Sequence, residues 1–133
     1  MSFQFPVRIY WEDTDAGGIV FYANYLKFFE RARTEWLRSL GIEQGALKET
    51  TGCMFVVSET SVKYLVPAKL DDELIVTAAV KEKGLASLII TQEALRKTDG
   101  AILAQGSIRV GWINTVTLRP VKIPNNILEA IQL

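Results

Sequence analysis

The chain has 133 residues, 49% of them hydrophobic and 23% charged, which suits one soluble domain over 1–133 with a buried core. Its 15 basic and 15 acidic residues cancel, so no charge excess marks a surface for nucleic acid or an anionic membrane. It has no histidine and one cysteine, Cys53, which excludes histidine-based catalytic triads and metal sites built from histidine or several thiolates.

The same counts bear on location and on chemistry. The first fifteen residues lack the basic segment and apolar run of a signal peptide, and no stretch is apolar enough to span a bilayer. These features predict a cytoplasmic protein without membrane insertion. Any general base has to be an aspartate, glutamate, lysine or tyrosine.

In chain order, the first expected element is a short strand over residues 3–11, with Pro6 near its start. The second is a long amphipathic helix that ends at Gly41, because apolar residues recur at helical spacing while most charged residues lie elsewhere. The recurring residues are Tyr25, Phe28, Phe29, Ala32, Trp36, Leu37 and Leu40. Such a wide aromatic face predicts that a sheet encloses the helix.

The rest of the chain alternates like strands, after a short helical or irregular piece at 43–50. Strands are expected over 53–66, 73–83, 85–97 and 101–115, with turns at Asp71-Asp72, Gly84 and Asp99-Gly100 and a short helix within 123–133. In the last strand one face should hold Ile102, Ala104, Gly106, Ile108, Val110 and Trp112. This order predicts an α+β fold, with an antiparallel sheet packed on one dominant helix.

Three carboxylates precede two glycines in EDTDAGGIVFYANY, residues 12–25. In an extended segment, Asp13 and Asp15 share a direction and Glu12 faces away. Asp15 stands beside Gly17 and Gly18, where backbone can approach a ligand closely. The N–H groups of the helix that follows can stabilise a developing negative charge, as an oxyanion hole does. A carboxylate and an oxyanion hole that face one carbonyl can hydrolyse an activated acyl group.

A structural role fits the same residues. Aspartate is common before glycine in turns and near helix starts as a cap, so spacing alone favours this interpretation for Asp15 and still more for Asp13. Asn24 is expected to be the helix N-cap. Glu30 and Glu35 are expected to be solvated or paired with nearby arginines.

Aromatic and sulfur-containing side chains have two explanations as well. Tyr22 and Tyr25 can donate hydrogen bonds, although aromatic residues that lead into a helix more often belong to the core. Cys53 is expected to be a small buried hydrophobe. Lys81 and Lys83, by a turn, can meet phosphates or simply be solvated.

Two longer segments resemble a known family. YWEDTDAGGIVFYANYLKFFERARTEWL, residues 10–37, is similar to the opening motif of hotdog-fold acyl-CoA thioesterases of the 4-hydroxybenzoyl-CoA thioesterase type. SVKYLVPAKLDDELIV, residues 61–76, resembles a second segment, and the Tol–Pal-associated branch is the closer overall likeness. The resemblance implies a hotdog fold, in which a curved antiparallel sheet wraps around one long central helix. It also implies homodimers or tetramers with active sites at the dimer interface.

For the site, the resemblance implies that Asp15 attacks the thioester carbonyl or activates a water. The backbone N–H near Tyr22 would polarise the carbonyl oxygen, and no metal or redox cofactor is needed. Tyr22 stands where the Tol–Pal-associated branch typically has histidine and the 4-hydroxybenzoyl type has tyrosine.

Substrate contacts are expected from two other groups of residues. Gly18, Phe21 and Tyr25 would contact the substrate beside the catalytic carboxylate, with core packing as the alternative for the two aromatic residues. Lys81 and Lys83 are what remains of the family's cluster for coenzyme A phosphates.

The leading hypothesis is therefore an acyl-CoA thioesterase that releases a carboxylic acid and a free thiol. The main alternative is a non-catalytic module that binds acyl-CoA or an acyl carrier protein. A hotdog dehydratase ranks last, because those enzymes typically use a histidine that this chain lacks. An interaction partner near the cell envelope is a further alternative.

Overall fold

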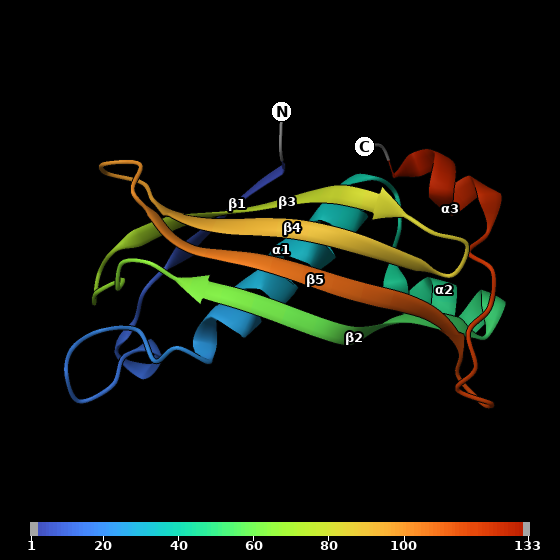
Figure 1. The fold of residues 1–133 in the computed structure, drawn as a ribbon, viewed down its shortest axis with the longest axis horizontal. Coiled ribbons are helices and arrows are strands. Elements are labelled where there is room, and N and C mark those ends of the chain that lie inside the picture. Colours follow the sequence, from blue (N-terminus) through green and yellow to red (C-terminus); the bar gives the residue numbers. More distant parts are fainter. Residues whose placement is uncertain (1–2, 132–133) are drawn as a thin grey trace.

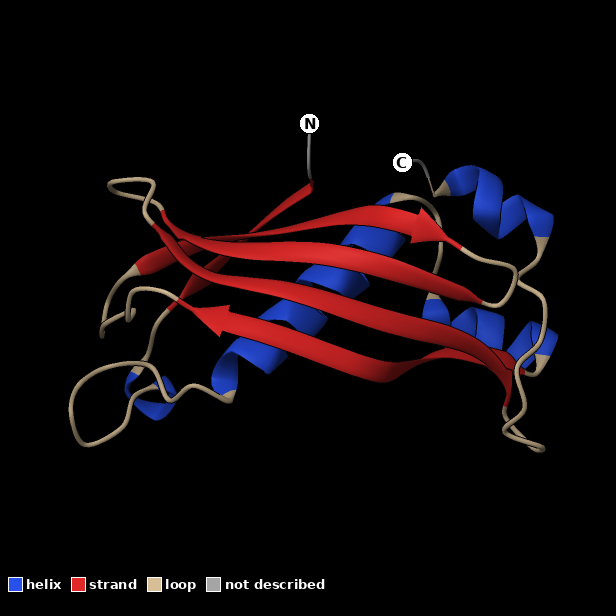
Figure 2. Cartoon of the chain, viewed as in Figure 1, coloured by secondary structure: helices blue, strands red, loops and turns tan. Residues whose placement is uncertain are grey.

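A five-stranded antiparallel sheet curves around one long helix in the structure, a computed structural model that describes residues 3–131 (Figure 1). Helix α1, Asn24–Ser39, crosses one face of the sheet diagonally. The two short helices, α2 (Gln44–Thr51) and α3 (Asn125–Ala130), both lie toward the same end of the sheet (Figure 2). The strands are β1 (Phe3–Arg8), β2 (Cys53–Tyr64), β3 (Glu73–Lys83), β4 (Ser87–Arg96) and β5 (Ile102–Asn114), in the sheet order β1-β3-β4-β5-β2.

The α+β layout expected from the sequence is confirmed. All four strand pairs are antiparallel, and α1 lies on the face that carries the buried side chains of β3, β4 and β5. Within the described part of the chain, every helix is too short or too polar to cross a membrane.

Helix α1 buries the expected apolar stripe and ends as expected. Gly41 has a φ of +80°, the left-handed backbone that glycine adopts most easily after a helix. The expectation for Asn24 was wrong, because Ala23 holds the N-cap position and Asn24 is the first helical residue. Its Nδ2 donates to the carbonyl of Asp13 at 2.9 Å, which ties the helix start to the preceding loop. The buried residues of the stripe are Tyr25, Phe28, Phe29, Ala32, Trp36 and Leu37.

Two strand expectations differ from the structure. The first strand ends at Arg8, since the N–H of Tyr10 donates to the Asp13 carboxylate at 2.9 Å and residues 11–13 form a 3₁₀ turn. In β5, Ala104, Ile108, Val110 and Trp112 are buried as expected, but Ile102 is 37% exposed while Leu103 is fully buried. The pairing of β5 with β4 shifts here, because Ala104 pairs with Ala94 but Ile102 pairs with Leu95. Leu103 is the extra residue of a bulge, so the inward and outward positions of β5 are exchanged on its N-terminal side.

Helix α1 packs tightly against Gly106 of β5. A Cβ atom at this position would lie 2.9 Å from Cε2 of Phe29 and 3.2 Å from Cδ1 of Ile108. Both of those side chains are almost fully buried, so neither has free space to move into. The missing side chain at Gly106 therefore lets α1 lie against the sheet.

We predict that Gly106→Ala lowers the free energy of unfolding by about 1–3 kcal/mol, the usual cost of overpacking a filled core. Gly111→Ala, on the same strand, is the matched control, because its Cβ would meet no atom closer than 3.9 Å. Urea denaturation of both variants measures the difference. Equal stability of the two variants would contradict this account of the helix–sheet contact.

Candidate active site

The loop that carries Asp15 is a short antiparallel ribbon that leads directly into α1. The N–H of Asp15 donates to the carbonyl of Ile19 at 2.9 Å, and the N–H of Phe21 donates to the carbonyl of Asp13 at 3.0 Å. A further bond at 2.9 Å, from the N–H of Val20 to the carbonyl of Ala68, attaches the ribbon to the segment before β3. The position of the carboxylate is therefore fixed relative to both the helix start and the sheet.

The two glycines shape the turn at the tip of the ribbon. The N–H of Gly17 donates to Oδ1 of Asp15 at 2.9 Å, and the N–H of Gly18 donates to the Asp15 carbonyl at 3.0 Å. Gly18 has a φ of +79°, where a side chain is strained. Among the described residues no donor reaches Oδ2 of Asp15, which is exposed to solvent, so one carboxylate oxygen is held and the other is open.

The start of α1 offers free hydrogen-bond donors next to this ribbon. The N–H of Asn24 donates to the carbonyl of Phe21, but within residues 3–131 the N–H groups of Tyr22 and Ala23 meet no acceptor. These groups carry the partial positive charge of a helix N-terminus. An open carboxylate and free N–H groups thus lie on one continuous segment.

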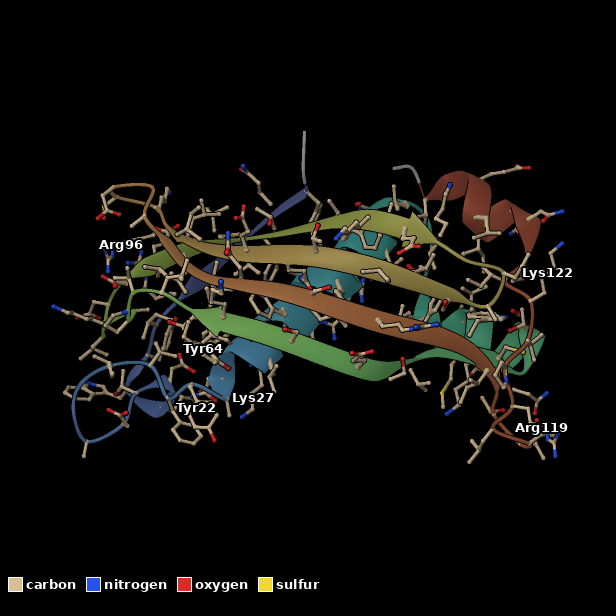
Figure 3. All side chains as sticks on the ribbon, viewed as in Figure 1. Tyr22, Lys27, Tyr64, Arg96, Arg119 and Lys122 are labelled. Atoms are coloured by element: carbon tan, nitrogen blue, oxygen red, sulfur yellow. The ribbon has the colours of Figure 1, made fainter. Side chains whose placement is uncertain are left out.

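An open apolar groove of about 260 Å³ lies beside the helix start. The ring of Tyr64 lies 6.0 Å from that of Tyr22 and 5.5 Å from that of Tyr25, measured between ring centroids. Figure 3 shows Tyr22 and Tyr64 at the end of the molecule that carries the Asp15 loop, with Lys27 on the following turn of α1. The groove is lined by Ile19, Val20, Tyr22, Tyr25, Tyr64, Leu65, Val66 and Pro67.

The aromatic candidates have different environments. Tyr25 is buried, its hydroxyl oxygen accepts the N–H of Ala68 at 3.3 Å, and burial raises the pKa of its phenol. Burial, with Tyr22 nearby, also raises the pKa of Tyr64. Phe21 is 46% exposed and packs on Tyr22 with ring centroids 4.9 Å apart. Tyr25 is thus a core residue, as one explanation expected, and also lines the groove, while its contact with substrate stays a prediction.

Sequence reasoning missed Tyr64 and the three residues after it as part of the site. Tyr64 is the last residue of β2 and the other three follow it, far from Asp15 along the chain, so no local spacing connects them. A usable signal was the apolar run Tyr-Leu-Val before Pro67, which comes directly after the mainly polar stretch of residues 58–63.

The two lysines predicted for coenzyme A lie at the other end of β3. The ammonium of Lys83 donates to the carbonyls of Leu128 and Ile131 at 3.1 and 2.7 Å, which holds the last turn of α3. Lys81 is exposed at a bulge in the pairing of β3 with β4. The Asp15 loop adjoins the segment before β3, so the 11-residue strand (Figure 1) separates it from these lysines within one protomer.

Other candidates from the sequence take structural roles. The carboxylate of Asp13 accepts the N–H of Tyr10, which agrees with the turn or cap expected for it. Glu35 pairs with Arg38 at 3.7 Å, Glu30 is exposed and Cys53 is buried. Within the described residues no three His, Cys, Asp or Glu side chains are grouped closely enough to hold a metal ion.

This sheet, curved around a central helix whose start carries a carboxylate loop, defines a hotdog-fold protein. A 1,4-dihydroxy-2-naphthoyl-CoA thioesterase from Synechocystis shares the fold with a TM-score of 0.91 and 19% identity, over 98% of this chain and 96% of that one. The chain belongs to the thioesterase-like superfamily, whose family model matches residues 9–131.

Two relatives are similar over nearly their whole length. The acyl-CoA thioesterase YbgC of Haemophilus influenzae is 43% identical, over 97% of this chain and 93% of that protein. The acyl-CoA thioester hydrolase YbgC of Escherichia coli O6:H1 is 37% identical, over 95% of this chain and 92% of that protein. The family resemblance expected from residues 10–37 and 61–76 is confirmed.

We predict that Gly18→Ala lowers the free energy of unfolding by about 1–2 kcal/mol, because an alanine side chain is strained at positive φ. Gly45→Ala, in α2, is the control with the opposite sign. Its Cβ would meet open space and its backbone is not left-handed, so it should stabilise by roughly 0.5–1 kcal/mol. Urea denaturation measures both, and a neutral Gly18→Ala would show that the turn does not need glycine.

Proposed function

We propose that Asp15 hydrolyses acyl-CoA thioesters as nucleophile or general base, with the start of α1 as the oxyanion hole. The family match and the 37–43% identity to acyl-CoA thioesterases make the chain an acyl-CoA thioester hydrolase. The observation that supports these residue roles is the ribbon of residues 13–21, which joins an open carboxylate to free helix N–H groups.

The chemistry requires a group that attacks and a group that stabilises negative charge. As a base, Asp15 takes a proton from a water that attacks the thioester carbonyl; as a nucleophile, its open oxygen attacks directly and water then cleaves the resulting anhydride. In either case the carbonyl oxygen becomes an oxyanion, which the free N–H groups of Tyr22 and Ala23 stabilise. The carbon–sulfur bond breaks, and the thiol leaves with a proton.

Tyr22 contributes its backbone rather than its phenol in this proposal. The side chain is 62% exposed and its ring packs beside Phe21 and Tyr64. A backbone donor is present whatever the side chain, so a tyrosine here is compatible with the same chemistry as the histidine typical of the Tol–Pal-associated branch.

We propose further that two chains pair through their β2 edges about a two-fold axis. Strand β2 bonds to β5 on one side, and within the described residues no strand covers its other edge. Free edges of this length pair readily with another strand. The strand also carries exposed apolar side chains, with Val57 50% and Tyr64 44% exposed.

We predict that Asp15→Asn lowers thiol release from acyl-CoA by at least about a hundredfold, because the amide is neither a base nor an anionic nucleophile. Asp13→Asn is the matched control: its side chain bonds to Tyr10 and takes no part in the proposed chemistry, so turnover should stay within about threefold. Thiol release from short, long and aromatic acyl-CoAs, and from an acylated carrier protein, is the measurement.

The outcomes separate the proposed functions. Full activity of a folded Asp15→Asn variant would move the chemistry to another group. Tight binding of intact acyl-CoA or acyl carrier protein by the wild type, with no thiol released from any substrate, would favour the non-catalytic module.

We predict that Tyr22→Phe keeps the thiol-release rate within about threefold of wild type, because the backbone donor is unchanged. The pH dependence of kcat should also keep its shape. A loss as large as that of Asp15→Asn would instead assign the phenol an acid–base role.

A further inference from the structure

A second cavity, of about 180 Å³, lies between α1 and the sheet, away from the groove at the helix start. Its apolar walls come from the helix and from three strands, β2, β4 and β5. They are formed by Leu37, Phe55, Val57, Leu88, Ile90 and Val110. The side chains of Arg33, Thr34 and Gln44 add a few polar groups, with the exposed Glu30 beside them. A mainly apolar cavity with few polar groups is typical of a small-molecule site.

Arg33 is the group in this cavity that most needs a partner. It is half-buried, its Nη1 donates to Oε1 of Gln92 at 2.9 Å, and burial lowers the pKa of its guanidinium. Among the described residues no carboxylate lies within 4.0 Å of it, although Glu30 is near enough to influence it. A guanidinium has five N–H donors and binds oxygen acceptors strongly where water is scarce.

Gln92 holds the guanidinium in place. Its amide nitrogen donates to the carbonyl of Phe29 at 2.9 Å and to that of Thr77 at 3.1 Å, so its oxygen is left to accept from Arg33. Gln92 is 1% exposed. The acceptor of Arg33 is therefore a neutral amide fixed by both the helix and the sheet, so this hydrogen bond does not neutralise the guanidinium charge.

The proposed dimer relates this cavity to the catalytic residues of the other protomer. Tyr64, at one end of β2, contacts Tyr22, while Phe55 and Val57, at the other end, line the cavity. Antiparallel pairing of two β2 edges sets opposite ends side by side. Tyr22 and Asp15 of one protomer then approach the cavity of its partner, whereas Arg33 lies roughly 16 Å along α1 from Tyr22 of its own chain.

We propose that this cavity receives the distal part of the acyl group and that Arg33 donates hydrogen bonds to an oxygen acceptor at its end. The inference rests on the proposed function, since the reacting carbonyl has to lie at Asp15 of the other protomer. An apolar cavity of about 150 Å³ holds benzene, so this one suits a ring or chain of about six carbons. The substrate class is a medium-length acyl-CoA with a terminal carboxylate or hydroxyl group.

The test compares hexanoyl-, 6-hydroxyhexanoyl- and adipoyl-CoA, which differ in the group at the chain end. In the wild type we expect kcat/KM for the acceptor-bearing substrates to exceed that for hexanoyl-CoA by about tenfold to a hundredfold, as for a charged hydrogen bond. Arg33→Met should abolish most of this preference and change kcat/KM for hexanoyl-CoA by less than about threefold. Arg31→Met, an exposed arginine on the same helix, should leave the preference intact. If the wild type prefers adipoyl-CoA but not 6-hydroxyhexanoyl-CoA over hexanoyl-CoA, the acceptor at the chain end is a carboxylate.

Three results would overturn the inference. In the first, the wild type shows no preference for an oxygen at the chain end. In the second, Arg33→Met lowers kcat/KM equally for all three substrates. In the third, Arg33→Met no longer dimerises. The last result would assign Arg33 to the contact between protomers. Light scattering measures the oligomeric state of each variant.

Thr34→Phe tests the cavity without touching the bond between Arg33 and Gln92. The phenyl ring should fill the cavity and reduce turnover of six-carbon substrates, while acetyl-CoA is still hydrolysed. Mixing this variant with Asp15→Asn gives heterodimers in which one site combines an intact Asp15 with an intact cavity. Random exchange should restore roughly a quarter of wild-type activity on adipoyl-CoA. No recovery after exchange would show that each cavity does not serve the other protomer's Asp15.

Binding to the Asp15→Asn variant keeps the two proposals separate. The Asp15→Asn variant should not hydrolyse adipoyl-CoA, so calorimetry can measure binding of the intact substrate. We expect the Kd of Asp15→Asn to be about tenfold lower than that of the double variant Asp15→Asn/Arg33→Met. Turnover by Asp15→Asn would defeat the proposed function, whatever the chain-end preference. Equal Kd values would defeat the inference alone.

Discussion

The close packing of α1 on the sheet is the contact on which the rest of the structure depends. Phe29 lies where a side chain at position 106 would collide with it, so only a glycine permits this distance. At nearly the same level, Gln92 bonds to the carbonyl of Phe29 and to that of Thr77, which links helix and sheet through buried polar groups. Apolar burial provides the free energy and the hydrogen bonds determine the position, since a misplaced helix would leave those groups unpaired.

The candidate site follows from this placement. Because α1 is held against the sheet, its first turn and the ribbon of residues 13–21 stay next to the segment before β3, to which Val20 and Ile9 are hydrogen-bonded. The carboxylate of Asp15 is then oriented by one glycine N–H and otherwise open to solvent. A reacting carbonyl needs an attacking oxygen and a charge-stabilising donor on fixed supports, and in the proposed function these are Asp15 and the N–H groups at the start of α1.

Strand β2 connects two regions that look unrelated in one protomer. One end, at Tyr64, belongs to the groove beside the Asp15 loop, and the other end, at Phe55 and Val57, belongs to the cavity of Arg33. In a symmetric dimer through this edge, the two regions become neighbours across the interface. Chemistry and acyl selection would then be divided between protomers, so the free edge of the sheet would itself be a functional feature.

The sequence by itself determined the long helix, the order of the strands and the carboxylate loop, because these depend on periodicity and on glycine positions within short segments. Since the chain has no histidine, its composition also limited the candidates for a catalytic base to a few residue types, of which Asp15 is one. Only the tertiary structure decided that Tyr64 joins Tyr22, that Lys83 binds the carbonyls of α3, that a bulge exposes Ile102 and that Arg33 meets Gln92. Each of these depends on strand register or on contacts between residues far apart along the chain, and local sequence patterns do not predict such contacts.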